Sequence, residues 1–84
     1  MPETTVTVTA EVGLHARPAA RFTKAAASFP CAVAVLRDGQ EADAKSMLSL
    51  LTLNVRQGDT ITIRTTGAEE DAALAELERL VGEL

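Results

Sequence analysis

Apolar residues recur in this sequence with two different spacings, every second residue in some segments and every third or fourth residue in others. Residues 4–9 and 60–65 alternate threonine with valine or isoleucine, which is the period of two expected for strands with one buried face. Residues 17–28 and 69–83 instead place apolar side chains three or four apart, which is typical of amphipathic helices. Because each strand has a single apolar face, we expect helices to cover one face of a sheet and leave the other open.

Further elements complete the predicted fold. Residues 31–36 form a valine- and alanine-rich strand, and residues 40–44 a short polar strand suited to a sheet edge, with Asp38 and Gly39 suited to a hairpin turn between them. Residues 46–53 form another helix, with Ser46 as N-cap and Asn54 in the left-handed conformation after its end. The order β-α-β-β-α-β-α predicts an α+β fold, a two-layer open-faced sandwich in which three helices cover one face of a four-stranded antiparallel sheet. A chain of 84 residues is predicted to form one domain, residues 1–84.

The core predicted for these helices follows from the same spacing. The helix at residues 17–28 carries Ala19, Phe22, Ala26 and Phe29 on one stripe, and the last helix carries Leu74, Leu77, Leu80, Val81 and Leu84. We expect both stripes to pack on the sheet.

The segment Gly13-Leu14-His15-Ala16-Arg17-Pro18-Ala19 lies where a strand pattern gives way to a helix pattern. Proline is favoured in the first turn of a helix, so the helix is predicted to begin at about Arg17 or Pro18. His15, the only histidine, would then lie just before the N-terminus of the helix.

That position favours a particular chemistry. The positive end of the helix dipole disfavours an imidazolium ion, so a ring nitrogen of His15 would stay nucleophilic, and the free backbone N–H groups can bind an anion. Arg17 can add donors for phosphate oxygens. These residue types suggest a histidine that accepts and hands on a phosphoryl group, while a helix cap or an ordinary surface histidine is the alternative that they leave open.

Two motifs resemble one known family. The Gly13–Ala19 segment resembles the active-site motif of HPr, the histidine-containing phosphocarrier of the bacterial sugar phosphotransferase system. Ala44-Lys45-Ser46-Met47-Leu48 resembles the regulatory-serine segment of the same family, at the expected separation. The resemblance covers essentially the whole chain. It implies the strand order 1-4-2-3, phosphorylation of His15 at Nδ1 and stabilisation of the phosphoryl group by Arg17.

A row of exposed cations is predicted on the first helix. Arg17, Arg21 and Lys24 lie at helical spacing along one strip, in a protein whose net charge is −4. Such a strip can steer an acidic partner toward His15, or it can simply be a solubilising face. In the HPr family such surfaces dock acidic patches of the phosphoryl donor, enzyme I, and of the acceptor domains, enzymes IIA.

The helix at residues 46–53 has more apolar residues than one buried face requires. Leu50 and Leu53 are predicted core residues, whereas Met47, Leu48 and Leu51 form an apolar patch beside the histidine if the family resemblance holds. Burial of all five is the alternative that the sequence leaves open. Ser49 replaces a glycine common in the family at this helix.

Ser46 has two readings. As an N-cap it needs no further purpose. A phosphate on Ser46 would also be tolerated at a helix N-terminus, and its negative charge would oppose docking of acidic partners. In some HPr lineages a dedicated kinase adds this phosphate, and an HPr kinase is therefore a candidate partner.

Composition excludes several other functions. The acidic net charge argues against a general nucleic-acid binder, and one histidine and one cysteine cannot build a multi-cysteine zinc site or another metal site. Cys31 opens an apolar run and is predicted to be a buried small side chain. We expect no cofactor, no membrane insertion, a cytoplasmic location and a monomer.

The sequence therefore predicts a phosphocarrier, not an independent catalyst. His15 would accept a phosphoryl group from phosphorylated enzyme I and pass it to sugar-specific enzyme IIA domains for carbohydrate uptake. The alternative is a regulatory binding module of the same fold, which acts through phosphorylation of Ser46 or through protein contact.

Overall fold

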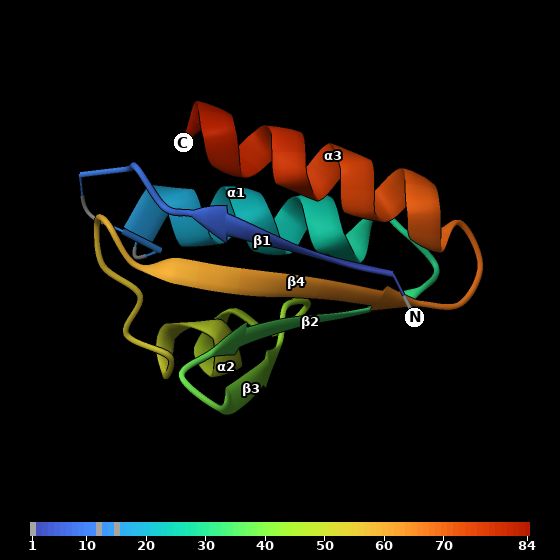
Figure 1. The fold of residues 1–84 in the computed structure, drawn as a ribbon. Coiled ribbons are helices and arrows are strands. Elements are labelled where there is room, and N and C mark those ends of the chain that lie inside the picture. The colour runs from blue at the N-terminus through green and yellow to red at the C-terminus, as the bar shows by residue number, and fades with distance from the viewer. Residues whose placement is uncertain (1, 12, 15) are drawn as a thin grey trace.

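The computed structural model describes residues 2–11, 13–14 and 16–84, and it has the predicted order of elements. The elements are β1 (Glu3–Thr7), α1 (Ala16–Ala27), β2 (Ala32–Arg37), β3 (Gln40–Asp43), α2 (Met47–Leu51), β4 (Thr60–Thr66) and α3 (Glu70–Glu83) (Figure 1). His15, on which the predicted chemistry depends, lies outside the described residues.

The strands form one antiparallel sheet in the order β1-β4-β2-β3, as predicted. The short polar strand β3 lies at an edge, also as predicted. Asp38 and Gly39 both have positive φ, 49° and 82°, which is the conformation of a tight hairpin turn whose twist matches the strands. The sequence pattern therefore predicted the strands and the hairpin between β2 and β3, and the family resemblance supplied the strand order.

The core lies between one face of the sheet and the helices. Inward-facing side chains of the two central strands are buried, namely Val33, Val35, Ile61 and Ile63. Ala19, Phe22 and Ala26 of α1 are fully buried. Figure 1 shows the three helices packed along the sheet, with α1 and α3 side by side.

The helix stripes were predicted with small errors. Leu77, Leu80 and Val81 are buried, whereas Phe29, Leu74 and Leu84 are only partly buried and pack at the margin of the core. Ala73 of α3 is fully buried and was not predicted, because alanine alone gives little hydrophobic signal.

The predicted boundaries differ from the observed ones by one or two residues at every element, and three of these differences bear on the site. β1 ends at Thr7 and not at residue 9, and α1 begins at Ala16, one residue earlier than expected. α2 ends at Leu51 and not at Leu53, because the last bonds, Leu53 N to Leu50 O and Asn54 N to Leu51 O, span only three residues and tighten the end of the helix. Asn54 has φ of 51°, the left-handed conformation predicted for it.

Candidate functional site

The segment that precedes His15 is tightly packed. Leu14 is fully buried, and its backbone N–H donates to the carbonyl oxygen of Val55 at 3.1 Å. The N–H of Gly13 donates to Ala10 O at 2.9 Å and closes a turn. The chain is thus held in place two residues before α1 begins.

Gly13 is required here by both conformation and space. Its φ is +64°, a region that side chains disfavour. A Cβ atom at this position would lie 2.1 Å from Val55 O and 2.6 Å from the Cα of Arg56, far inside normal contact. The backbone before residue 15 therefore touches the backbone that follows α2. The sequence does not predict this contact, because no residue type marks a close approach of two backbones.

The first turn of α1 offers unneutralised donors. Its first N–H groups have no acceptor within the helix, and no acidic side chain lies in that turn. Arg17 is exposed in the same turn, and Pro18 is half-buried behind it. An anion beside this helix end would meet backbone donors and a guanidinium group.

The basic strip, which we define as Arg17, Arg21 and Lys24, is exposed along its length, as predicted. Within the described residues no ion pair involves any of these three side chains. Arg21 and Lys24 line a shallow groove between α1 and α3, together with Ala25, Ser28, Glu76 and Leu80. These two cations therefore border the α3 side of the helix, and the sequence did not predict this.

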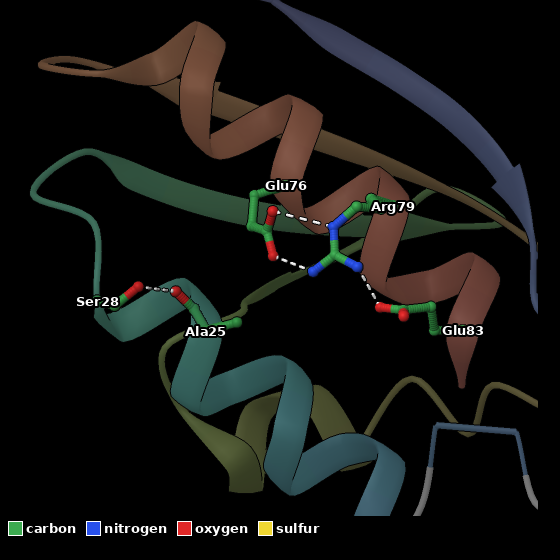
Figure 2. A network of polar contacts seen from close by, with 5 residues as sticks. All are labelled: Ala25, Ser28, Glu76, Arg79 and Glu83. Atoms are coloured by element: carbon green, nitrogen blue, oxygen red, sulfur yellow. Dashed lines mark hydrogen bonds and ion pairs between the residues drawn. The ribbon is translucent and has the colours of Figure 1, made fainter.

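Glu76, which lines the α3 side of this groove, belongs to a cluster of three charged side chains within α3. Arg79 donates to Glu76 and to Glu83, one turn away on either side, whereas on α1 Ser28 Oγ donates to Ala25 O at 2.6 Å (Figure 2). The hydrogen bond and the positive charge from Arg79 lower the pKa of Glu76, and Glu76 in turn raises the pKa of Arg79.

Ser46 caps α2, as predicted. Its backbone is extended at φ −110° and ψ 110°, and its Oγ accepts a hydrogen bond from Ser49 N at 3.3 Å. Two neighbours fix this helix start: Lys45 Nζ donates to Phe29 O at 2.7 Å, and Ser46 N donates to Asp43 O at 3.0 Å. The serine is half-buried.

The two faces of α2 divide its apolar residues. Leu50 and Leu53 are buried, as predicted for the core, while Met47 is 36% and Leu48 78% exposed. Leu51 is partly buried and packs against the core. The alternative in which all five residues are buried is thus wrong. Of the predicted apolar patch, Met47 and Leu48 are therefore exposed and Leu51 is partly buried.

Other chemistry has little support in the described part of the chain. Cys31 is a free thiol only 2% exposed, which agrees with its prediction as a buried small side chain. In residues 2–11, 13–14 and 16–84 no group of three or more His, Cys, Asp and Glu side chains could hold a metal ion. No helix among those same residues is both long and apolar enough to span a membrane.

Comparison with known proteins places this arrangement in a family. A family model described as "PTS HPr component phosphorylation site" matches residues 2–83. The phosphocarrier protein HPr of Vibrio cholerae is 40% identical over 84 residues, which cover 100% of this chain and 99% of that protein.

Solved structures agree. HPr from Thermoanaerobacter tengcongensis superposes with a TM-score of 0.97 at 34% identity, over 99% of this chain and 93% of that one. The Bacillus subtilis catabolite repression protein Crh, seen as a dimer with a swapped domain, gives a TM-score of 0.80 at 37% identity, over 99% and 95% of the two chains. With the family model matched from residue 2 to residue 83 and the open-faced fold shared with solved HPr structures, the chain belongs to the HPr family of phosphocarrier components of the phosphotransferase system.

Proposed function

We propose that residues 1–84 act as a single HPr-like domain that carries a phosphoryl group on His15 from phosphorylated enzyme I to enzyme IIA domains. The observation that carries the proposal is the pairing of the Gly13–Ala19 motif with the family match, since the family description names a phosphorylation site. The cytoplasm is the compartment in which we propose that this exchange occurs.

The proposed step is a reversible transfer without a net change of oxidation state. The phosphoryl group leaves enzyme I and forms a P–N bond with the ring of His15, at Nδ1 by the resemblance to the family. That bond breaks when an enzyme IIA domain accepts the group, and the free imidazole returns. The N–H donors at the start of α1, in a turn without acidic side chains, support stabilisation of the phosphoryl oxygens.

Arg17 is assigned to the phosphoryl group and not primarily to docking. It is exposed in the first turn of α1, close in sequence to His15. We expect Arg17→Ala to slow transfer far more than it weakens binding of enzyme I, and Arg21→Ala, its matched control one turn along the same strip, to weaken binding and leave the transfer step nearly unchanged.

The docking surface that we propose has an apolar centre and a basic rim. Met47 and Leu48 supply exposed apolar area, and the exposed cations of the basic strip supply charge for acidic partners. Transient interfaces commonly have this composition.

Incubation with phosphoenolpyruvate and enzyme I, followed by intact mass before and after mild acid, tests the carrier function. We expect one added phosphoryl group that acid removes, that is absent from His15→Ala and that persists in Ser46→Ala. Circular dichroism of His15→Ala should show an intact fold. Absence of any addition, beside a competent control HPr, would refute the proposal.

A regulatory module is the second candidate, and the similarity to Crh favours it. Its site would be Ser46, whose Oγ already accepts the N–H of Ser49 at the start of α2. An acid-stable phosphate added by an HPr kinase and lost in Ser46→Ala would support this role. The presence of both His15 and Arg17 favours the carrier, because a module that acts through Ser46 does not need them.

We propose that the carrier is a monomer. Crh is a swapped dimer, so light scattering at several concentrations should separate the two states. A dimer mass that persists on dilution would contradict the monomer.

A further inference from the structure

We propose that Arg37 and Asp59 form a positioning brace that holds Val55 against Gly13 and Leu14, and so sets the turn that leads into the phosphoryl-accepting site. This inference rests on the proposed function for its consequence in transfer. Its structural part can be measured independently.

The first half of the brace is a half-buried ion pair at the end of β2. Arg37 Nε and NH2 each lie 3.1 Å from Asp59 Oδ2, and NH1 donates to the carbonyl oxygen of Leu53 at 3.1 Å. The side chains are 24% and 29% exposed, so solvent screens this pair less than a fully exposed one. One guanidinium group therefore ties together two points of the segment between α2 and β4.

The second half of the brace joins Asp59 to Arg56 through two hydrogen bonds. Asp59 Oδ2 accepts the backbone N–H of Arg56 at 2.8 Å, and Asp59 N donates to Arg56 O at 3.0 Å. Val55 lies between the two held points, Leu53 and Arg56. Its carbonyl oxygen is therefore fixed on both sides by contacts that originate at Arg37 and Asp59.

The carbonyl oxygen of Val55 contacts the segment that leads into the candidate site. It accepts the N–H of Leu14 at 3.1 Å, and it leaves no room for a side chain at Gly13. Asp59 also reaches the preceding loop directly, because its carbonyl oxygen accepts Val8 N at 2.8 Å. The brace thus bears on both ends of the loop between β1 and α1.

A second strand arginine offers a matched comparison. Arg64 in β4 also pairs with two carboxylates, Glu3 and Glu41, and its side chain is 30% exposed. Glu3 belongs to β1 and Glu41 to β3, so the ion pairs of Arg64 do not involve residues 53–59. Loss of Arg64 removes the same charge from the sheet without touching the loop.

The test compares Arg37→Met, Arg37→Lys and the control Arg64→Met. Amide hydrogen exchange would measure protection of Leu14, and steady-state phosphorylation by enzyme I would give kcat and KM for the chain as substrate. In Arg37→Met we expect the hydrogen-exchange rate of the Leu14 amide to rise about tenfold relative to core amides. Local opening costs less free energy in this variant, because the contacts of Arg37 with Asp59 and Leu53 are already absent. We also expect kcat to fall between about tenfold and about a hundredfold with KM unchanged, since small displacements strongly affect transfer.

The variants separate positioning from stability. Arg64→Met should change neither quantity, and Arg37→Lys should be intermediate, because one ammonium group cannot contact Asp59 and Leu53 O together. Equal effects of Arg37→Met and Arg64→Met on kcat, or exchange at Leu14 that rises only in step with the core, would overturn the brace. If the wild-type chain accepted no phosphoryl group, the proposed function would fail, and exchange at Leu14 alone would decide the brace.

Discussion

Helices α1 and α3 lie next to each other (Figure 1), but their positively charged side chains differ in whether they form ion pairs. In α3, Arg79 is paired with Glu76 on one side and Glu83 on the other. In α1, the basic strip has no ion pair within the described residues. The one arginine of α3 is therefore paired within its own helix, whereas the described ion pairs include no cation of the basic strip.

Apolar side chains follow the same division. The exposed large apolar residues found in the described part of the chain, Met47 and Leu48, both belong to α2, which packs against α1. In α3 the large apolar residues are buried or partly buried. This difference is the reason why we propose the docking surface around α1 and α2 and not on α3.

The largest expected effect is on the free energy of unfolding, and it distinguishes the buried face of α2 from the exposed face. Leu50→Ala removes a fully buried side chain and should lower the free energy of unfolding by about 2–5 kcal/mol. Leu48→Ala removes a side chain that is 78% exposed and should change stability by less than about 0.5 kcal/mol. Urea unfolding measures both.

Calorimetry with an enzyme IIA domain should show that Leu48→Ala weakens binding by about 1–2 kcal/mol. A large loss of stability in Leu48→Ala would break the comparison.

A pair of glycines extends the comparison to the turns. Gly13→Ala and Gly39→Ala both place a side chain at positive φ, but only at Gly13 would the new Cβ meet backbone, 2.1 Å from Val55 O. We expect Gly13→Ala to cost about 1–3 kcal/mol more than Gly39→Ala in urea unfolding, because the backbone must shift. Equal costs would show that the contact with Val55 is loose.

Single charges should have smaller effects that differ between the helices. Lys24→Gln and Arg79→Gln remove the same charge, yet only Lys24 belongs to the basic strip. Lys24→Gln should weaken binding to an acidic enzyme IIA domain by about 0.2–1 kcal/mol, with a smaller salt dependence. Arg79→Gln should leave binding unchanged. Equal weakening by both variants would indicate that net charge alone, and not the strip, guides docking.

The smallest expected effect is a shift in the titration of Glu76. Its pKa is lowered in the folded protein by the hydrogen bond and charge of Arg79, so the pair stabilises the fold above the unfolded-state pKa and this contribution is lost as pH falls through the folded-state pKa. NMR titration of the Glu76 side chain should show the lowered pKa, and Arg79→Gln should return it toward the ordinary value. An ordinary pKa in the unmodified chain would show that the pair does not form in solution.

The sequence predicted much of the fold because its signals are local. Threonine alternation with Ile61 and Ile63 predicts which face of β4 is buried, and Ser46 marks the start of α2 as its N-cap. Asn54 has the predicted left-handed conformation, but it lies beyond Thr52, the C-cap of α2. The strand order 1-4-2-3 came from the family resemblance, since periodicity carries no information on which strands are neighbours.

For the candidate site, the structure tests only local features of the predicted residues, and it adds contacts that the sequence did not predict. Exposure of Leu48 and the N-cap at Ser46 agree with the predictions, whereas the roles of His15, Arg17 and the partner-binding residues stay predictions. The contact of Gly13 with Val55 and the Arg37–Asp59 pair join segments that are distant in sequence. No local pattern reports such contacts, so only the folded chain reveals them.

The most direct test of the account is the complete relay. The chain would be phosphorylated by enzyme I, purified, and mixed with an enzyme IIA domain, while intact mass follows the phosphoryl group on both proteins over time. We predict that the group appears on enzyme IIA at the rate at which it leaves this chain, and much faster than it is lost to water alone. Loss of the group at the same rate with and without enzyme IIA would contradict the account.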